Sequence, residues 1–314
     1  MKRSNIASLS WVLPSCLLVV LLGGSIGSFG LLADEYIATE AGHTNHREVI
    51  KAWRASRHQR LTRSDGWLTL VGLEWLAEGE NRVGSAVDND IQLSGGPAYW
   101  GTVTLENDKV YFTSSGDESV RINNVIQHQS ELIPDTRGEE TVVSSGSLSF
   151  HVIFRESYGL RVKDSEARAL KDFTGVDNYP IDESWRIEGR MVRAEEGATL
   201  EVANVLGQIS KSAVYGSFEF DRNGQRHRLI GLVSEQSSSI WFIFSDRTSG
   251  RGTYGAGRFL YSDGMPRGDK LTVDFNKAYN PPCAFNEFST CPLTPQENRL
   301  RMAVRAGEKK YHHD

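Results

Sequence analysis

The hydrophobic pattern of this chain begins with one long apolar run. A basic start, Met1-Lys2-Arg3, precedes apolar residues 6–32, which small residues dilute toward the end. This order is typical of a secretory signal peptide, and the run exceeds the ~20 residues that a membrane anchor needs. We therefore expect residues 1–33 to be a signal peptide or anchor. The protein would then be exported, periplasmic or extracellular, and would contact a membrane only through this segment.

The next segment has the spacing of an amphipathic helix. Over residues 45–62, apolar side chains recur every three or four positions, with basic residues around them. The sequence predicts a helix over residues 45–63. Its basic face could contact anionic lipid, but a solvated face on a helix packed against the following domain explains the pattern better.

From Trp67 onward, apolar and polar residues alternate in short runs. A period of two, broken by Asn-Asp, Gly and Ser-Ser, is typical of antiparallel β structure. We expect a mainly β protein, with a β-sandwich over residues 65–155 and a second antiparallel barrel or half-barrel over residues 156–310. Within the second region, residues 240–244 are apolar on both faces and predict a central strand.

Charge and motif content narrow the class of function. The 314 residues carry 35 Lys and Arg against 40 Asp and Glu, a formal net charge of −5, which disfavours nucleic acid as a partner. One G-x-G-x-x-G stretch, residues 250–255, is followed by another strand pattern and so lacks the helix of a dinucleotide-binding fold. No nucleophile-elbow motif and no zinc or calcium motif is present in the sequence. We expect no cofactor and no metal.

Polar residues gather among glycines and prolines over residues 246–298, a composition that fixes polar groups in space. We interpret this stretch as a pocket for a small polar or anionic ligand or for a partner's chain end. Arg258 would bind a carboxylate or phosphate, and Asp246 and Asp274 would orient the ligand. The candidate ligand-binding residues are Asp246, Arg251, Tyr254, Arg258, Asp274, Asn276, Tyr279 and Asn280.

Two alternatives stay open for the same stretch. In a hydrolase, Asp246 or Asp274 would act as general base, and the two carboxylates would face one another across a cleft. In a purely structural network, the same side chains would pair with each other over the open end of a barrel. The pocket hypothesis predicts that Arg258→Met lowers the melting temperature by less than about 4 °C, because groups that await a ligand contribute little to stability.

Cys283 and Cys291 are the cysteines that remain after loss of the first segment, which contains Cys16. An even pair in an exported chain favours a disulfide that closes this short, proline-flanked loop. Buried reduced thiols and a metal site are the alternatives. The metal site is disfavoured because neither cysteine has another Cys or a His at a ligand spacing.

Longer motifs in the same stretch resemble a known family. They are TYG-x-GR at residues 253–258, DFN-x-AYNPPCAF at 274–285, and TCP at 290–292 followed by Asn298. Together they resemble the signature of the domain-of-unknown-function family 1684. Residues 65–76 and 158–167 are also similar to that family, so the resemblance covers residues 50–310. It implies no activity, since the family is named for lacking one.

A looser resemblance concerns the first β region. Residues 83–85, 89–91 and 121–124 resemble parts of a forkhead-associated β-sandwich. That family binds phosphothreonine with an Arg after the glycine and a Ser-x-x-His further on. This chain has Ser85 after Gly84, and Tyr99-Trp100-Gly101 where the Ser and His would lie. The resemblance therefore implies a sandwich and argues against phosphopeptide binding.

Overall fold

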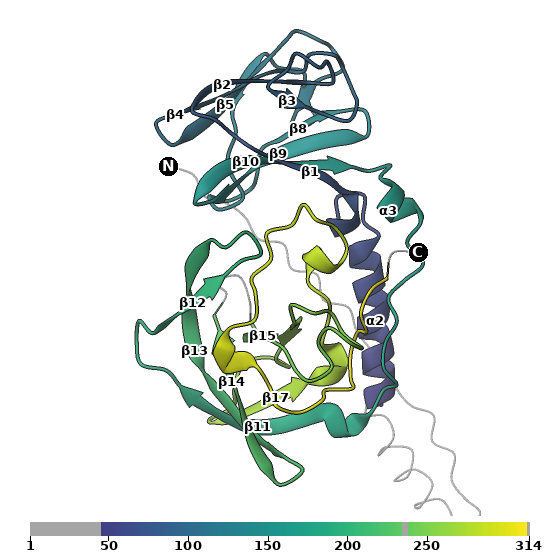
Figure 1. Ribbon diagram of the computed structural model, residues 1–314, viewed down its shortest axis with the longest axis vertical. Helices are drawn as coiled ribbons and strands as arrows, with labels where there is room; N and C mark the ends of the chain where they lie inside the picture. The colour runs from purple at the N-terminus through teal and green to yellow at the C-terminus, as the bar shows by residue number, and fades with distance from the viewer. Residues whose placement is uncertain (1–44, 234–237, 313–314) are drawn as a thin grey trace, which may run out of the picture. The chain divides into compact units, whose positions relative to one another are not determined.

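The computed structural model describes residues 45–233 and 238–312, which belong to one compact unit. The segment expected to direct export, residues 1–33, lies outside the described residues. Figure 1 shows one long helix, α2, beside two regions of β-sheet. No helix in the described part of the chain is long and apolar enough to cross a membrane.

The predicted N-terminal helix is confirmed as α2, His46–Leu61. The Asn45 side chain accepts a hydrogen bond from the Arg47 amide at 3.0 Å, which satisfies one of the free N–H groups of the first helical turn. The buried residues of α2 are seven and four positions apart, on one face of the helix. They are Ile50, Arg57 and Leu61. The helix therefore packs against the protein along this face.

The first β region is a sandwich of two five-stranded sheets, as predicted. One sheet has the order β1-β10-β9-β8-β6, and the other has the order β3-β2-β4-β5-β7. In the core between them, the ring of Phe150 packs against Trp100 and Phe112, with centroid distances of 5.8 Å for both pairs. The strands are β1 Leu70–Trp75, β2 Gly79–Gly84, β3 Ile91–Gln92, β4 Gly101–Glu106, β5 Lys109–Ser114, β6 Arg121–Ile122, β7 Gln129–Glu131, β8 Val142–Ser145, β9 Leu148–Arg155 and β10 Ser157–Asp164.

The second β region is one seven-stranded antiparallel sheet. Its order is β16-β15-β14-β13-β11-β17, and β12 pairs with β13 beside this path. The sheet curls into a half-barrel, which confirms the predicted fold class (Figure 1). Its strands are β11 Arg186–Arg193, β12 Thr199–Ala203, β13 Ile209–Arg222, β14 Gln225–Leu232, β15 Trp241–Phe244, β16 Arg258–Tyr261 and β17 Lys270–Asp274.

Local turn chemistry explains the long hairpin of β13 and β14. Asn223 and Gly224 have φ angles of 52° and 74°. Positive φ at both central residues is the geometry of a two-residue type I′ turn, which Asn-Gly favours because neither residue pays much steric cost there. The turn pairs Arg222 with Gln225 and so sets the register of the hairpin.

Both faces of the half-barrel are covered by side chains. Phe242 and Phe244 of β15 belong to the larger core, and Ile243 between them belongs to a smaller core on the opposite face. The strand lies between β14 and β16, as its apolar pattern predicted. Asn298, which is fully buried, donates from its side chain to the carbonyls of Ile230 and Ile243 at 2.9 Å. The C-terminal segment thereby connects β14 to β15.

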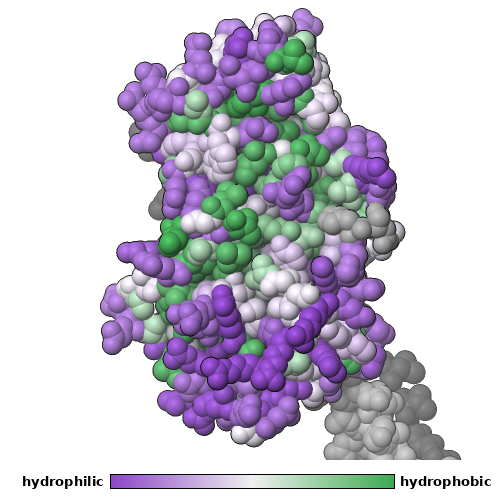
Figure 2. All heavy atoms as spheres, in the orientation of Figure 1, coloured by the Kyte–Doolittle hydropathy of each residue, from purple (hydrophilic) through white to green (hydrophobic). Residues whose placement is uncertain are grey.

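Short helices join these elements: η1 Trp67–Thr69, α3 Arg168–Lys171, η2 Glu183–Trp185, η3 Phe275–Lys277, η4 Pro282–Ala284 and η5 Gln296–Asn298. On the face shown in Figure 2, apolar residues gather across the middle and hydrophilic residues dominate above and below. Trp67 and Tyr261 are among the exposed large apolar residues, and both line the cavity described next.

Candidate functional site

The centre of the predicted site is a buried ion pair. Arg258 at the start of β16 is fully buried, and Asp246 after β15 is 8% exposed. The Arg258 Nη2 donates to Asp246 Oδ2 at 3.0 Å and to the Val304 carbonyl at 2.9 Å, and Nη1 donates to the Ala306 carbonyl. Asp246 Oδ1 accepts from the amide and hydroxyl of Thr248. In this structure the Arg258 guanidinium holds the C-terminal segment, as the alternative of a structural network expected, and it does not line the cavity described below.

Asp274 and Asn276 make a second internal connection. Asp274, at the end of β17, is 1% exposed. Its Oδ1 accepts from the backbone and side-chain nitrogens of Asn276 at 3.0 and 2.8 Å, and its Oδ2 lies 2.7 Å from His46 Nε2. Asp274 and Asp246 share no hydrogen-bond partner within the described residues. In this structure both carboxylates pair with other protein groups, as the alternative of a structural network expected, and not with each other across a cleft.

The other predicted residues divide between the interior and the surface. Asn280 is fully buried, and its amide donates to Glu308 Oε2 at 2.7 Å. The Tyr254 hydroxyl donates to the Cys283 carbonyl at 3.1 Å. Arg251 is exposed. Among the predicted site residues, Tyr279 alone lines the cavity described below.

Cys283 and Cys291 are free thiols in this structure, so the expected disulfide is not formed in it. Each residue instead donates its backbone N–H to the sulfur of the other, at 3.0 and 3.3 Å. A hydrogen bond between the two thiol side chains lowers the pKa of Cys283 and raises that of Cys291. The arrangement corresponds to the alternative of buried reduced thiols. No group of His, Cys, Asp and Glu side chains in the described ranges could hold a metal ion.

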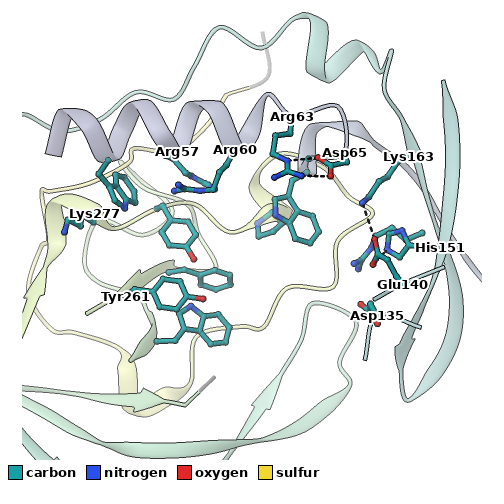
Figure 3. A pocket seen from close by; sticks show the side chains of 18 of the residues that line it. Arg57, Arg60, Arg63, Asp65, Asp135, Glu140, His151, Lys163, Tyr261 and Lys277 are labelled. Atoms are coloured by element: carbon teal, nitrogen blue, oxygen red, sulfur yellow. Dashed lines mark hydrogen bonds and ion pairs between the residues drawn. The ribbon is translucent and has the colours of Figure 1, made fainter. Parts of the chain in front are cut away.

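A cavity of about 1020 Å³ lies where α2, the sandwich and the half-barrel meet (Figure 3). Ligand pockets commonly measure ~300–1,000 Å³, so this one could hold a drug-sized molecule. Three parts of the chain that are far apart in sequence form its walls. The lining includes Trp53, Arg57 and Arg60 from α2, His151, Arg161 and Lys163 from β9 and β10, and Trp241, Phe259 and Tyr261 from β15 and β16.

One side of the cavity is an aromatic wall, formed by Trp53, Trp241, Phe259, Tyr261 and Tyr279. Trp241 and Tyr261 are register partners on β15 and β16, with ring centroids 6.3 Å apart and planes inclined by 21°. Tyr279 continues the series, 6.4 Å from Tyr261 and inclined by 14°. Burial raises the pKa of both tyrosines, so their hydroxyls stay protonated at neutral pH. The wall offers ring faces and neutral hydroxyl groups.

The cavity also has a cationic end, formed by Arg155, Arg161 and Lys163; Figure 3 shows Lys163 on the other side of the cavity from Tyr261. Arg161 and Lys163 are two positions apart on β10, so they share one face of the strand. Arg161 is 5% exposed, and its guanidinium carbon lies 5.6 Å from the centroid of the Trp67 ring. Its Nη2 donates to Thr290 Oγ1 at 3.2 Å, whereas Nε has no hydrogen-bond partner in the described chain. Burial lowers the pKa of Arg161 and of Lys163.

Carboxylates neutralise part of this end. Asp135 pairs with Arg155 at 2.7 Å, and Glu140 lies 4.0 Å from Lys163 and 3.5 Å from His151 Nε2 (Figure 3). Burial and the neighbouring cations Lys163 and Arg161 lower the pKa of His151 to about 3. The imidazole is therefore neutral at pH 7, and its contact with Glu140 is not an ion pair.

The whole lining carries an excess of positive charge. Seven cations line the cavity against four carboxylates, which leaves an excess of three (7 − 4) while His151 is neutral. The complete chain has a net charge of −5, so this concentration of cations is local. A cleft lined by one sign of charge raises the local concentration of the opposite ion. The lysines and arginines are Arg57, Arg60, Arg63, Arg155, Arg161, Lys163 and Lys277, and the acids are Asp65, Asp135, Glu140 and Asp263.

Sequence reasoning missed this cavity apart from Tyr279. A usable signal was present in YGLRVKD, where Arg161 and Lys163 interrupt an otherwise apolar strand at a period of two. Two cations on one face of a buried strand require either internal partners or a ligand. In β9 the signal was weaker, because His151, the register partner of Arg161, is a single histidine among apolar residues.

Comparison with known protein families finds one family that matches part of the chain. Residues 171–309 match the family described as "Protein of unknown function (DUF1684)". The chain therefore contains a DUF1684 segment. The match is shorter than the range 50–310 over which the motifs resemble the family, and it contains the half-barrel strands from β11 to β17. The aromatic wall lies within the DUF1684 segment except for Trp53, whereas the cationic end lies before it.

Two solved structures are similar to parts of this chain. One is the NMR structure of an uncharacterized protein from Haloarcula marismortui, 30% identical, covering 46% of this chain and 80% of that chain, with a TM-score of 0.38. The other is the structure of the FHA (forkhead-associated) domain of Rv0020c, 15% identical, covering 30% of this chain and 92% of that chain, with a TM-score of 0.21. Neither indicates a function at these scores. No curated protein matches the chain.

Proposed function

We propose that this protein binds a small organic anion in the cavity between α2, the sandwich and the half-barrel. Arg161 is the observation that carries the proposal. Its side chain is 5% exposed, and its Nε lacks a hydrogen-bond partner among the described residues. The carboxylates that act on its charge, Asp135 and Glu140, lie closer to Arg155 and Lys163. A buried charge whose counter-ions are shared with other cations is costly, and an anionic ligand offsets that cost.

The surroundings of Arg161 support the same ligand chemistry. Lys163 lies on the same face of β10, and the lining as a whole has three more cations than carboxylates. Arginine presents a planar set of donors that matches a carboxylate or phosphate, and such charge-assisted hydrogen bonds are stronger than neutral ones. Burial reduces the screening of these charges by water. The cavity thus has the charge and the donors for an anion.

Pyrophosphate, a compact anion, is a suitable first probe in isothermal titration calorimetry at low ionic strength. We expect the wild type to bind it and Arg161→Met to bind at least tenfold more weakly, about 1.4 kcal/mol. Arg251→Met is the matched control, because Arg251 is an exposed arginine outside the cavity. This control should bind within twofold of the wild type. Added salt should weaken wild-type binding, since part of the attraction is electrostatic.

The melting temperature of Arg161→Met separates a ligand-binding arginine from a structural one. A residue positioned for an absent ligand leaves the melting temperature of the free protein unchanged or raised when it is replaced. Equal pyrophosphate affinity in the wild type and in Arg161→Met, together with a large loss of stability in the variant, would assign Arg161 to the fold. Failure of the wild type to bind would also reject the proposal.

We further propose that the protein acts after export. The basic start and apolar run of residues 1–33 support this location. N-terminal sequencing of protein recovered from outside the cytoplasm should identify a start near Asp34 if the segment is removed. Protein found only in the cytoplasm, with Met1 or Lys2 as its first residue and no attachment to membranes, would contradict export.

A further inference from the structure

The aromatic wall places flat ring surfaces opposite the cationic end. Trp241, Tyr261 and Tyr279 form a series of rings inclined to their neighbours by 21° and 14°. Tyr261 is 38% exposed although it lies in a cavity, so part of its surface is free for contact with a ligand. A ligand ring that stacks on such side chains is attracted to them, because offset-stacked aromatic rings interact favourably.

The aromatic wall is held in position by buried groups. The Arg57 guanidinium lies 4.7 Å from the centroid of the Tyr279 ring. Arg57 itself donates to Glu308 Oε1 at 3.0 Å and to the Asn280 carbonyl at 2.9 Å. Both partners are buried, which fixes the cation over the ring. Binding a ligand on such a preformed surface requires little ordering of side chains, and this favours affinity.

The two sides of the cavity favour different chemical groups in a bound ligand. A ligand that is only a ring would leave the buried Arg161 guanidinium without a charged partner in direct contact. A simple inorganic anion would leave the aromatic wall in contact with water. Because Glu308 already compensates Arg57, the lining has two cations in excess (7 − 4 − 1), which favours a group of more than one negative charge. A phosphate monoester carries about −1.5 to −2 at pH 7. A molecule with both parts satisfies both sides.

We propose that the ligand is a phosphate monoester that carries a flat ring, of the kind found in a nucleoside monophosphate, with its ring on the aromatic wall and its phosphate at the cationic end. This inference rests on the proposed anion-binding function and adds the class of ligand. It involves no bond making or breaking. Base stacking on aromatic side chains tolerates different bases, so the wall alone selects for a ring and not for one base.

Titration calorimetry of the complete protein with AMP, ribose 5-phosphate and adenosine tests each part separately. We expect AMP to bind at least tenfold more tightly than ribose 5-phosphate, which lacks the ring, and than adenosine, which lacks the phosphate. Phenyl phosphate, which has a ring and a phosphate without a sugar, distinguishes an aryl phosphate ligand from a nucleotide. Tighter binding of either ring-bearing phosphate than of ribose 5-phosphate supports the proposed class.

Two variants locate the contacts. Tyr261→Leu keeps an apolar side chain but removes the flat ring, and its partly exposed position makes the fold tolerant of the change. It should reduce AMP binding to within about threefold of ribose 5-phosphate binding and leave the latter unchanged. Arg161→Met should weaken both phosphates at least tenfold and leave adenosine unchanged.

The outcomes separate this inference from the anion-binding function. Equal affinity for AMP and ribose 5-phosphate in the wild type would overturn the ring contact, while anion binding would stand. Adenosine binding as tight as that of AMP would overturn the role of the phosphate. If pyrophosphate and all three phosphate esters fail to bind, both proposals fall. The wild-type series alone decides these cases, so they do not depend on whether a variant folds.

Discussion

Replacement of Arg258 by methionine removes the charge at the centre of the buried ion pair while keeping most of the aliphatic volume. Arg258 is fully buried, and its guanidinium serves Asp246 and the carbonyls of Val304 and Ala306. The variant leaves the Asp246 carboxylate buried, with only Thr248 and the Val304 amide as donors. The perturbation therefore combines an uncompensated charge with carbonyls that lose their donor.

The expected cost follows from these contacts. Breaking a buried pair by removing one partner costs about 3–5 kcal/mol. A change of 1 kcal/mol shifts the melting temperature by ~2–4 °C in proteins of 150–250 residues, so Arg258→Met should lower it by roughly 6 to 20 °C. This is opposite to the small shift that the pocket hypothesis predicted from the sequence. The two expectations differ because Arg258 is buried and does not line the cavity, so it cannot contact a ligand there.

Thermal and urea unfolding, followed by circular dichroism, measure the effect. Arg251→Met is the control, since Arg251 is exposed on the neighbouring loop and should cost less than about 0.5 kcal/mol. In the double variant Arg258→Met/Asp246→Leu, the stranded carboxylate is gone, so the loss should be smaller than the sum of the two single losses by ~1 kcal/mol or more. An Arg258→Met melting temperature within 4 °C of the wild type would refute the structural role of this pair.

Three further predictions concern single features of the fold. His151 has a pKa of about 3 in the folded protein against 6.5 in the unfolded protein, so the unfolded state binds more protons as the pH falls. Between pH 7.5 and 4.5, the free energy of unfolding should therefore fall by about 2–3 kcal/mol more in the wild type than in His151→Gln, as measured by urea unfolding. Parallel pH profiles of the two proteins would contradict this. Gly257→Ala should lower the free energy of unfolding by more than ~2 kcal/mol, because φ is +107° and a Cβ would lie 2.1 Å from Thr294 Oγ1. Gly224→Ala is the milder control, since no atom lies within 4 Å of the Cβ it would add. Equal losses of stability in the two variants would contradict the close approach at Gly257. Free Cys283 and Cys291 predict two reactive thiols in protein that is unfolded without reductant, and unreactive protein by thiol titration would show that a disulfide forms.

Local patterns predicted most of the fold. The helical spacing of residues 45–63, the alternation from Trp67 onward and the doubly apolar strand β15 all correspond to observed elements. These features depend on the chain's own periodicity and on turn residues such as Asn223 and Gly224, so a single sequence contains them. The curl of the half-barrel depends on pairings such as β11 with β17, which are far apart in sequence and leave no local pattern.

The functional site was much less predictable. The polar residues of the stretch 246–298 were correctly recognised as fixed in space, but their partners lie elsewhere. Arg258 contacts residues near the C-terminus, and Asp274 contacts His46 at the other end of the described chain. Composition cannot distinguish polar groups that pair with each other from polar groups that line a cavity. Tyr279 was identified because it is an aromatic residue in that stretch, not because its contact with the cavity could be foreseen.

The cavity is formed partly by α2, which lies outside the segment that matches the DUF1684 family. The segment shared with the DUF1684 family, residues 171–309, excludes α2 and also β9 and β10, which supply two of the three cavity walls. A protein cut at those boundaries would keep the aromatic strands but lose Arg161, Lys163 and the buried contact of Arg57 with Glu308. The part that a family comparison recognises is therefore smaller than the part that forms the cavity. Relatives that share the half-barrel but replace the residues before it would have a different cavity lining while keeping the family signature.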